Sequence, residues 1–115
     1  MTHPDAPRHI EIDDGGQTVA AAEVAAPAEP GGTARTSLRA APGHVAPGKR
    51  ADLVDAVMDL PEVQSSARLE ATVALGDAES LERLRQRTKD TVTRPAGSTA
   101  LVDAEIPSPS QPASG

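Results

Sequence analysis

The chain has 115 residues and a formal net charge of −6, and it contains neither an aromatic residue nor a cysteine. Without cysteine it has no disulfide, no thiol nucleophile and no thiolate metal site, and without aromatic rings it has no stacking platform for single-stranded nucleic acid. The length allows one small domain at most, with a core built from aliphatic side chains alone.

The first part of the chain, residues 1–46, is rich in Ala, Pro and Gly, and we expect it to be disordered. Such a segment buries too little apolar surface to offset an ordering cost of ~1–2 kcal/mol per residue. Within it, residues 9–12 alternate like a short strand before an Asp-Asp-Gly-Gly turn signal, and residues 17–26 are typical of a few helical turns. Residues 36–40 are too polar for a buried strand.

A short motif with the residue spacing of a phosphate-binding loop occurs near the end of this segment. Gly43, Gly48 and Lys49 match the pattern G-x-x-x-x-G-K-[ST], but Arg50 stands where the magnesium-binding hydroxyl belongs. Pro47 has no N–H to offer a phosphate. We therefore interpret the segment as a Pro/Gly linker followed by a basic helix start, and not as a nucleotide site.

From residue 47 onward the apolar pattern becomes regular. Leu53, Val54, Val57 and Leu60 recur at helical spacing, which predicts a helix from about Lys49 to Leu60 that ends or kinks at Pro61. Residues 68–75 alternate as a half-buried strand.

A second helix is predicted from Ala78 to about Lys89, with Asp77 as its N-cap. Glu79 and Arg83 are spaced to form an i, i+4 ion pair along it. Residues 91–94 and 99–106 then read as two strands, which we expect to form a hairpin.

These elements predict a small α+β domain, helix–strand–helix–strand–strand, over residues 47–106, between disordered tails at 1–46 and 107–115. The run from Val54 to Val63, followed by a strand and by residues 76–81, resembles ferredoxin-like regulatory modules such as the ligand-binding domains of leucine-responsive-type regulators. That resemblance implies a degenerate ferredoxin-like fold. Because the aliphatic core is thin, we also predict self-association or folding on a protein partner.

Two charged surfaces are the candidate interaction sites. An acidic stripe opposes the apolar face of the first helix, and a basic run follows the second; the residues are Asp52, Asp55, Asp59, Arg83, Arg85, Arg87 and Lys89. Solvated helix surfaces explain both. As an alternative, the basic stripe of one subunit meets the acidic stripe of another, or the run 83–94 binds nucleic acid or another acidic partner weakly.

No catalytic, cofactor or metal residue is predicted. The histidines, His3, His9 and His44, all fall in the segment expected to be disordered, and no nucleophile–base pair is visible. We therefore predict a non-catalytic interaction or regulatory accessory protein, not an enzyme, with a small-ligand-sensing ferredoxin-like module as the alternative. The composition is typical of a GC-rich gene, favouring an actinobacterial source, and the lack of an apolar leader or span favours the cytoplasm. Nucleic acid and membranes are not expected partners.

Overall fold

The computed structural model describes residues 7–29, 31–40 and 45–107 of the chain. Nine elements follow one another along it. They are β1 (Arg8–Asp14), β2 (Gln17–Ala25), β3 (Thr33–Ala40), α1 (Lys49–Met58), α2 (Pro61–Gln64), β4 (Arg68–Ala74), α3 (Ala78–Arg87), β5 (Lys89–Ala96) and β6 (Thr99–Glu105).

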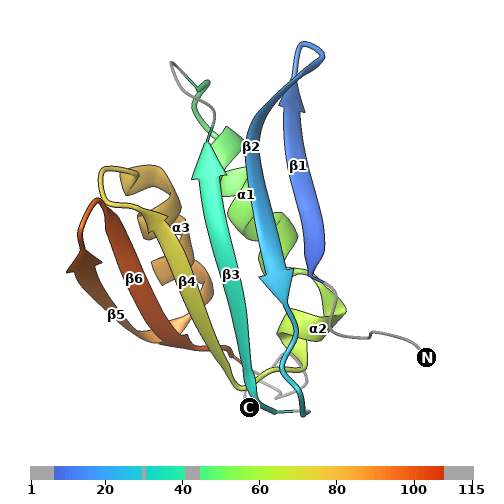
Figure 1. The fold of residues 1–115 in the computed structure, drawn as a ribbon, viewed down its shortest axis with the longest axis vertical. Helices are drawn as coiled ribbons and strands as arrows, with labels where there is room; N and C mark the ends of the chain where they lie inside the picture. The colour runs from blue at the N-terminus through green and yellow to red at the C-terminus, as the bar shows by residue number, and fades with distance from the viewer. Residues whose placement is uncertain (1–6, 30, 41–44, 108–115) are drawn as a thin grey trace, which may run out of the picture.

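All six strands join one mixed sheet in the order β1-β2-β3-β4-β6-β5 (Figure 1). The pair β3–β4 at its centre is parallel, and every other neighbouring pair is antiparallel. The parallel pair needs a crossover, which α1 and α2 provide, whereas short turns connect β1 to β2 and β5 to β6. Strands β1 and β5 form the two edges.

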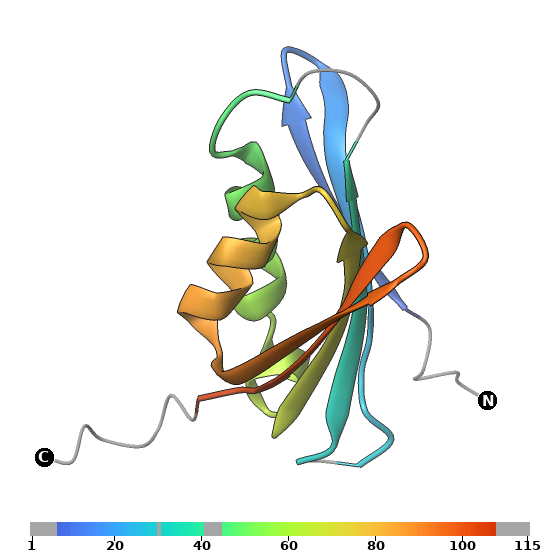
Figure 2. The same ribbon diagram turned by 90° about the vertical axis from the view of Figure 1, so that its left-hand side faces the viewer.

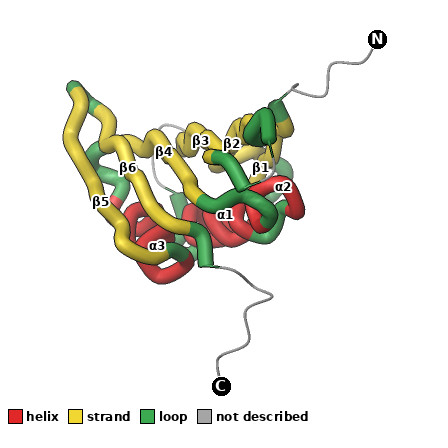
Figure 3. The backbone as a smooth tube through the Cα atoms, turned by 90° about the horizontal axis from the view of Figure 1, so that it is seen from below, coloured by secondary structure: helices red, strands yellow, loops and turns green. Residues whose placement is uncertain are grey.

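The helices lie on one face of the sheet only (Figures 2 and 3). Many of the residues that the strands present to this face are small, and those of the helices are larger. Alanines dominate the strand side: Ala20, Ala22, Ala34, Ala71, Ala100 and Ala104 are all at most 2% exposed. Leucine, valine and methionine supply the helix side, for example Leu53, Val57, Met58 and Leu84. Small strand residues let the helices approach closely, which is how a core without any aromatic ring is filled.

The predicted fold class is wrong. The chain does not form a small ferredoxin-like domain between disordered tails, because three strands, β1 to β3, lie within the range 1–46 that we expected to be disordered. These strands make half of the sheet and bury Ala20, Ala22 and Val24 against the helices. The ferredoxin-like resemblance fails with the fold class.

Two local interpretations account for this error. Residues 17–25 form strand β2 and not helical turns, because pairing with β1 and β3 on both sides overrides the helix propensity of alanine. Strand β3 was judged too polar, yet it alternates, with Ala34, Thr36 and Leu38 buried. The Thr36 hydroxyl donates to the Glu23 carbonyl, so its burial leaves no unpaired group.

The regular part of the chain follows the prediction closely. The first helix ends before Pro61, the second is capped by Asp77, and the last two strands form a hairpin. Residues 108–115 of the predicted tail lie outside the described residues. No helix in the described part of the chain is long and apolar enough to cross a membrane.

Candidate functional site

The central parallel strands separate partway along their length, and we call this separation the fork. Strands β3 and β4 pair from Thr33 with Arg68 up to Ser37 with Thr72. Beyond this last rung β3 continues to Ala40, still paired with β2, and β4 continues to Ala74, still paired with β6. Each strand therefore keeps its outer neighbour and loses its inner one, as Figure 1 shows.

The fork exposes backbone hydrogen-bonding groups. Successive residues of a strand direct their N–H and C=O groups alternately toward its two neighbours. Residues 38–40 therefore present at least one N–H and one C=O to the fork from β3, without a ladder partner among the described residues. From β4, Ala74 presents its N–H, whereas its carbonyl already accepts from the Asp77 N–H at 3.0 Å. Facing strand edges of this kind are suited to an extended ligand that contains amide groups.

A polar row crosses the uncovered face of the sheet at the base of the fork. Cross-strand register places His9 opposite Glu23, Glu23 opposite Ser37, and Ser37 opposite Thr72. These side chains alternate with the buried ones, so all four point away from the helices. An acid–base pair thus stands beside the last rung before the strands part.

Glu23 is held within this row by two cationic or titratable neighbours. Its Oε2 lies 3.6 Å from His9 Nδ1 and 3.8 Å from a guanidinium nitrogen of Arg39, a residue of β3 beyond the last rung. The other ring nitrogen of His9 lies 2.9 Å from Glu11 Oε2. Hydrogen bonds from His9 and then from Thr18 lower the pKa of Glu11. His9 is therefore placed between two carboxylates and close to solvent.

A shallow hollow of about 280 Å³ lies on the same face. Glu23, Ser37 and Thr72 line it together with Arg35, Thr36, Ala25 and Pro7. The hollow is open to solvent and contains the carboxylate of Glu23. A small cationic or amine-bearing molecule can therefore reach the base of the fork from this side.

The two longer helices of the covered face begin at the end where the fork opens, because α1 follows β3 and α3 follows β4. The two helix starts are capped differently. The side chain of Asp77 caps α3 locally, accepting from the Ser80 backbone N–H at 3.0 Å and from its hydroxyl at 2.7 Å. Helix α1 has Gly48 as N-cap and no side-chain cap of its own.

The start of α1 is capped by a residue of the other helix. Glu79 Oε2 accepts from the backbone N–H of Gly48 at 3.0 Å and from that of Ala51 at 2.9 Å. In return Arg50 of α1 reaches Asp77 Oδ1 at 3.1 Å. We call these reciprocal contacts of Arg50, Asp77 and Glu79 the helix latch. Carboxylates of the chain therefore fill the position at each helix start that attracts anions.

The candidate interaction residues meet within one chain. Arg83 binds Asp55 through two bonds of 2.9 and 2.8 Å, and Arg87 bridges Asp55 and Asp59 at 2.7 Å each. We call these four residues the interhelix cluster. The hydrogen bond from Arg83 is the main cause that lowers the pKa of Asp55, and this pairing also raises the pKa of Arg83.

The other candidate residues do not join this cluster. Asp52 and Arg85 are exposed on α1 and α3, and Lys89 is exposed at the start of β5. The intersubunit pairing of the two stripes stays a prediction, but Asp55, Asp59, Arg83 and Arg87 already have partners in their own chain. No group of three or more potential metal ligands occurs among the described residues.

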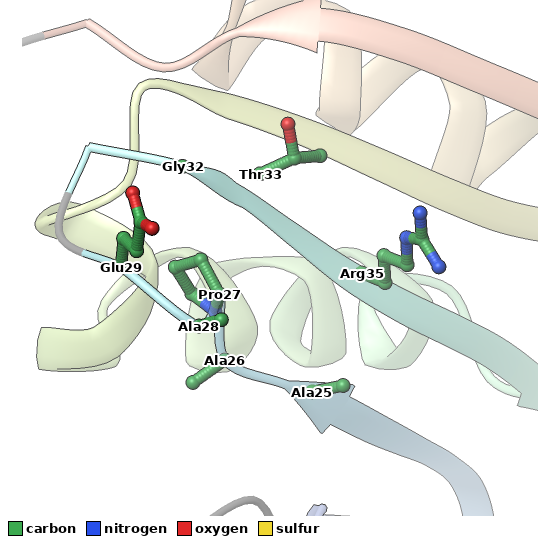
Figure 4. Close-up of a pocket in the computed structure, with 8 residues that line it drawn as sticks. All are labelled: Ala25, Ala26, Pro27, Ala28, Glu29, Gly32, Thr33 and Arg35. Atoms are coloured by element: carbon green, nitrogen blue, oxygen red, sulfur yellow. The ribbon is translucent and has the colours of Figure 1, made fainter.

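A second hollow, of about 450 Å³, lies at the opposite end of β3 (Figure 4). Residues 25–29, Gly32, Thr33 and Arg35 line it. Its two charged side chains, Glu29 and Arg35, come from opposite ends of the lining and do not face each other (Figure 4). It therefore lacks the paired groups that the base of the fork has.

Comparison with solved structures identifies the fold. The ribosomal-protein-alanine N-acetyltransferase of Brucella melitensis matches at 16% identity and a TM-score of 0.59, covering 88% of this chain and 69% of its own. An acetyltransferase of the GNAT family from Streptococcus pneumoniae matches at 12% identity and 0.61, with 90% and 68% covered. The yncA protein of Salmonella typhimurium, solved with its cofactor acetyl-CoA, matches at 14% and 0.54, with 82% and 60% covered.

The chain therefore has the fold of the GNAT acetyltransferases, a six-stranded mixed sheet with helices. No protein-family model and no curated protein matches it. The neighbours overturn our prediction of a non-catalytic accessory protein that is not an enzyme, together with its ligand-sensing alternative. That prediction rested on a folded part without histidine, whereas His9 lies in β1 within the sheet.

The prediction missed the β1, β2 and β3 side of the fork because it assigned residues 1–46 to a disordered segment, whereas the β4 side lies in the predicted strand 68–75. Residues 9–12 alternate between apolar and polar side chains, which indicates a strand. The weaker alternation of Ala34, Thr36 and Leu38 with exposed residues is the signal that indicates β3. The latch had no such signal. Glu79 and Arg83 were expected to pair with each other along α3, and both instead turn toward α1.

Proposed function

We propose that this chain transfers an acyl group from a thioester donor to an amine, with the donor bound in the fork. The fork carries this proposal: two parallel strands part beside a carboxylate on the uncovered face. The similarity to acetyltransferase structures, one of them solved with acetyl-CoA, supports acetyl-CoA as the donor to test first.

The arm of such a donor fits the fork. Between its thioester and its phosphates this arm contains two amide groups, which pair with the N–H and C=O groups of residues 38–40 and with the N–H of Ala74. The arm then lies as an extra half-strand between β3 and β4, and its thioester end points toward the last rung, Ser37 and Thr72.

The open end of the fork does not offer a free site for the diphosphate of acetyl-CoA. At the mouth of the fork, Glu79 fills the start of α1 and Asp77 holds Arg50. An added anion there would have to displace the Glu79 carboxylate from the N–H groups of Gly48 and Ala51. No step of the reaction proposed below involves the diphosphate.

Acyl transfer needs an acceptor for one proton. The nitrogen of a neutral amine attacks the thioester carbonyl carbon, a C–N bond forms, and the C–S bond breaks with the sulfur leaving as a thiolate. Glu23 accepts the proton that the nitrogen loses, and His9 relays a proton to the solvent side, from which the thiolate is protonated. Arg39 and the N–H groups of the fork are the donors available to the carbonyl oxygen as it gains charge.

The test measures thiol release from acetyl-CoA and from S-acetylpantetheine over a panel of amines, with and without Glu23→Gln. General-base catalysis typically contributes about 10²–10⁴-fold, so we expect kcat to fall by that order while the KM for the donor changes little. Glu70→Gln is the matched control, because Glu70 lies on the same face and pairs with the exposed Arg35. Equal activity of the Glu23 variant would remove the proposed role of that residue, and no thiol release from either donor would remove the function.

We keep two further parts of the prediction as proposals, namely self-association and a cytoplasmic location. The thin aliphatic core motivates the first. Sedimentation at micromolar concentration tests it, and a stable monomer would contradict it.

A further inference from the structure

The helix latch has a consequence for which thioesters the fork accepts, and this consequence rests on the acyl-transfer function proposed above. We infer that Glu79 is a specificity-determining residue for the donor, because its carboxylate occupies the place at the start of α1 that a donor phosphate would need. The fork then selects a thioester by its amide arm and gains nothing from a diphosphate.

The capping geometry is the first support. Gly48 has no side chain with which to cap α1, and its φ of 91° lies in the left-handed region that favours glycine. Pro47 has no N–H, and Lys49 donates its own to the Ala46 carbonyl at 3.3 Å. The N–H groups of Gly48 and Ala51 are thus donors at this helix start, and one oxygen of Glu79 takes both.

The contrast with α3 is the second support. Asp77 caps its own helix from three residues away and is buried, with 5% of its side chain exposed. Glu79 reaches Gly48 across 31 residues of sequence, and that bond is exposed. The second bond of Glu79, to Ala51, is part-buried, so this carboxylate is fixed at the start of α1 and not loosely placed in solvent.

The charge around the latch points the same way. Arg50 is the basic side chain that reaches across to α3, and Asp77 already neutralises it. Because Arg50 and Asp77 neutralise each other, an entering diphosphate would meet the negative charge of Glu79, and like charges at this range repel. The Glu79 carboxylate therefore competes with the phosphates of a donor for the start of α1. The strand edges of the fork stay accessible to the amide arm.

The experiment compares two donors that share the amide arm and thioester but differ in phosphate content, acetyl-CoA and S-acetylpantetheine. Calorimetric titration of each into the full chain, into Glu79→Gln and into Glu79→Ala separates the two ends of the donor. The wild-type chain should bind both with similar affinity. Removing the carboxylate should raise the affinity for acetyl-CoA by about tenfold in Glu79→Ala and less in Glu79→Gln, whose amide oxygen can still cap.

S-acetylpantetheine serves as the internal control for folding, because its affinity should stay within about twofold in both variants. Glu82→Ala removes an exposed carboxylate from the same helix and should leave both affinities unchanged. Unchanged binding of acetyl-CoA in the Glu79 variants, or a strong wild-type preference for acetyl-CoA, would overturn the inference and leave the acyl-transfer proposal standing. Failure of every protein to bind either donor would overturn both.

Discussion

The two faces of the sheet differ in what their residues do. The covered face is mostly apolar, with many alanines on the strands and leucine, valine and methionine on the helices. The uncovered face is polar and its charges pair across strands, as Arg35 does with Glu70 and Arg68 with Asp103. Exposed pairs of this kind add little to stability, so the two faces separate the residues that hold the fold from those free to do chemistry.

The largest expected effect is a loss of stability from a substitution on the covered face. Leu69 is fully buried on β4 at the centre of the sheet, so Leu69→Ala leaves a cavity beneath the helices. We expect a loss of about 2–5 kcal/mol in the free energy of unfolding, measured by urea titration. Leu101→Ala is the control on the uncovered face, where the side chain is only half-buried. Equal losses in the two variants would contradict the division between the faces.

A smaller effect is expected where the two helices of the covered face meet. In Asp55→Asn, Arg83 and Arg87 lose the charge that both of them share. Because these side chains are partly exposed, we expect a loss of about 1 kcal/mol, visible as a lower melting temperature. Glu70→Gln breaks a more exposed pair on the other face and should have no measurable effect. An unchanged melting temperature in Asp55→Asn would show that the interhelix cluster is only a solvated surface.

The smallest effect is a dependence of stability on pH. Arginine partners hold the pKa of Asp55 and of Glu62 below their usual values of 3.8 and 4.5, so both groups release protons more readily in the folded chain. Their stabilising contribution is complete above those usual values and is lost as the pH falls through the lower folded values. Urea midpoints at pH 7, 5 and 3 should drop mainly below about pH 5. The drop should be shallower in Asp55→Asn, and an equal drop would assign the loss to other groups.

The sequence predicts one half of this molecule and misses the other for a physical reason. In α1, β4 and α3, leucine and valine recur at clear helix or strand periods, and Pro61 and Asp77 mark where helices begin. In β2 and β3 the inward positions are mostly alanine and threonine, whose side chains carry little periodic signal. Those strands are stable because they pair with neighbours on both sides, which is a property of the sheet and not of the segment.

The candidate site was missed for a different reason. His9, Glu23 and Ser37 come together only through the register of three strands, and no spacing along the chain signals it. The latch likewise joins residues that are 27 to 31 positions apart. Asp77 was found because a local cap has a local signature, whereas a cap supplied by another helix has none.

The edge strand β5 shows how the sheet ends without inviting further strands. An open edge is a template for aggregation, and this one is exposed over nearly its whole length. Pro95 removes one backbone donor from it, and Lys89, Asp90 and Arg94 add charges that a second strand would have to desolvate. The register shift between Lys89 and Val92 twists the strand further. These features of β5 therefore oppose the addition of a further strand, and with it fibril growth, at this exposed edge of the sheet.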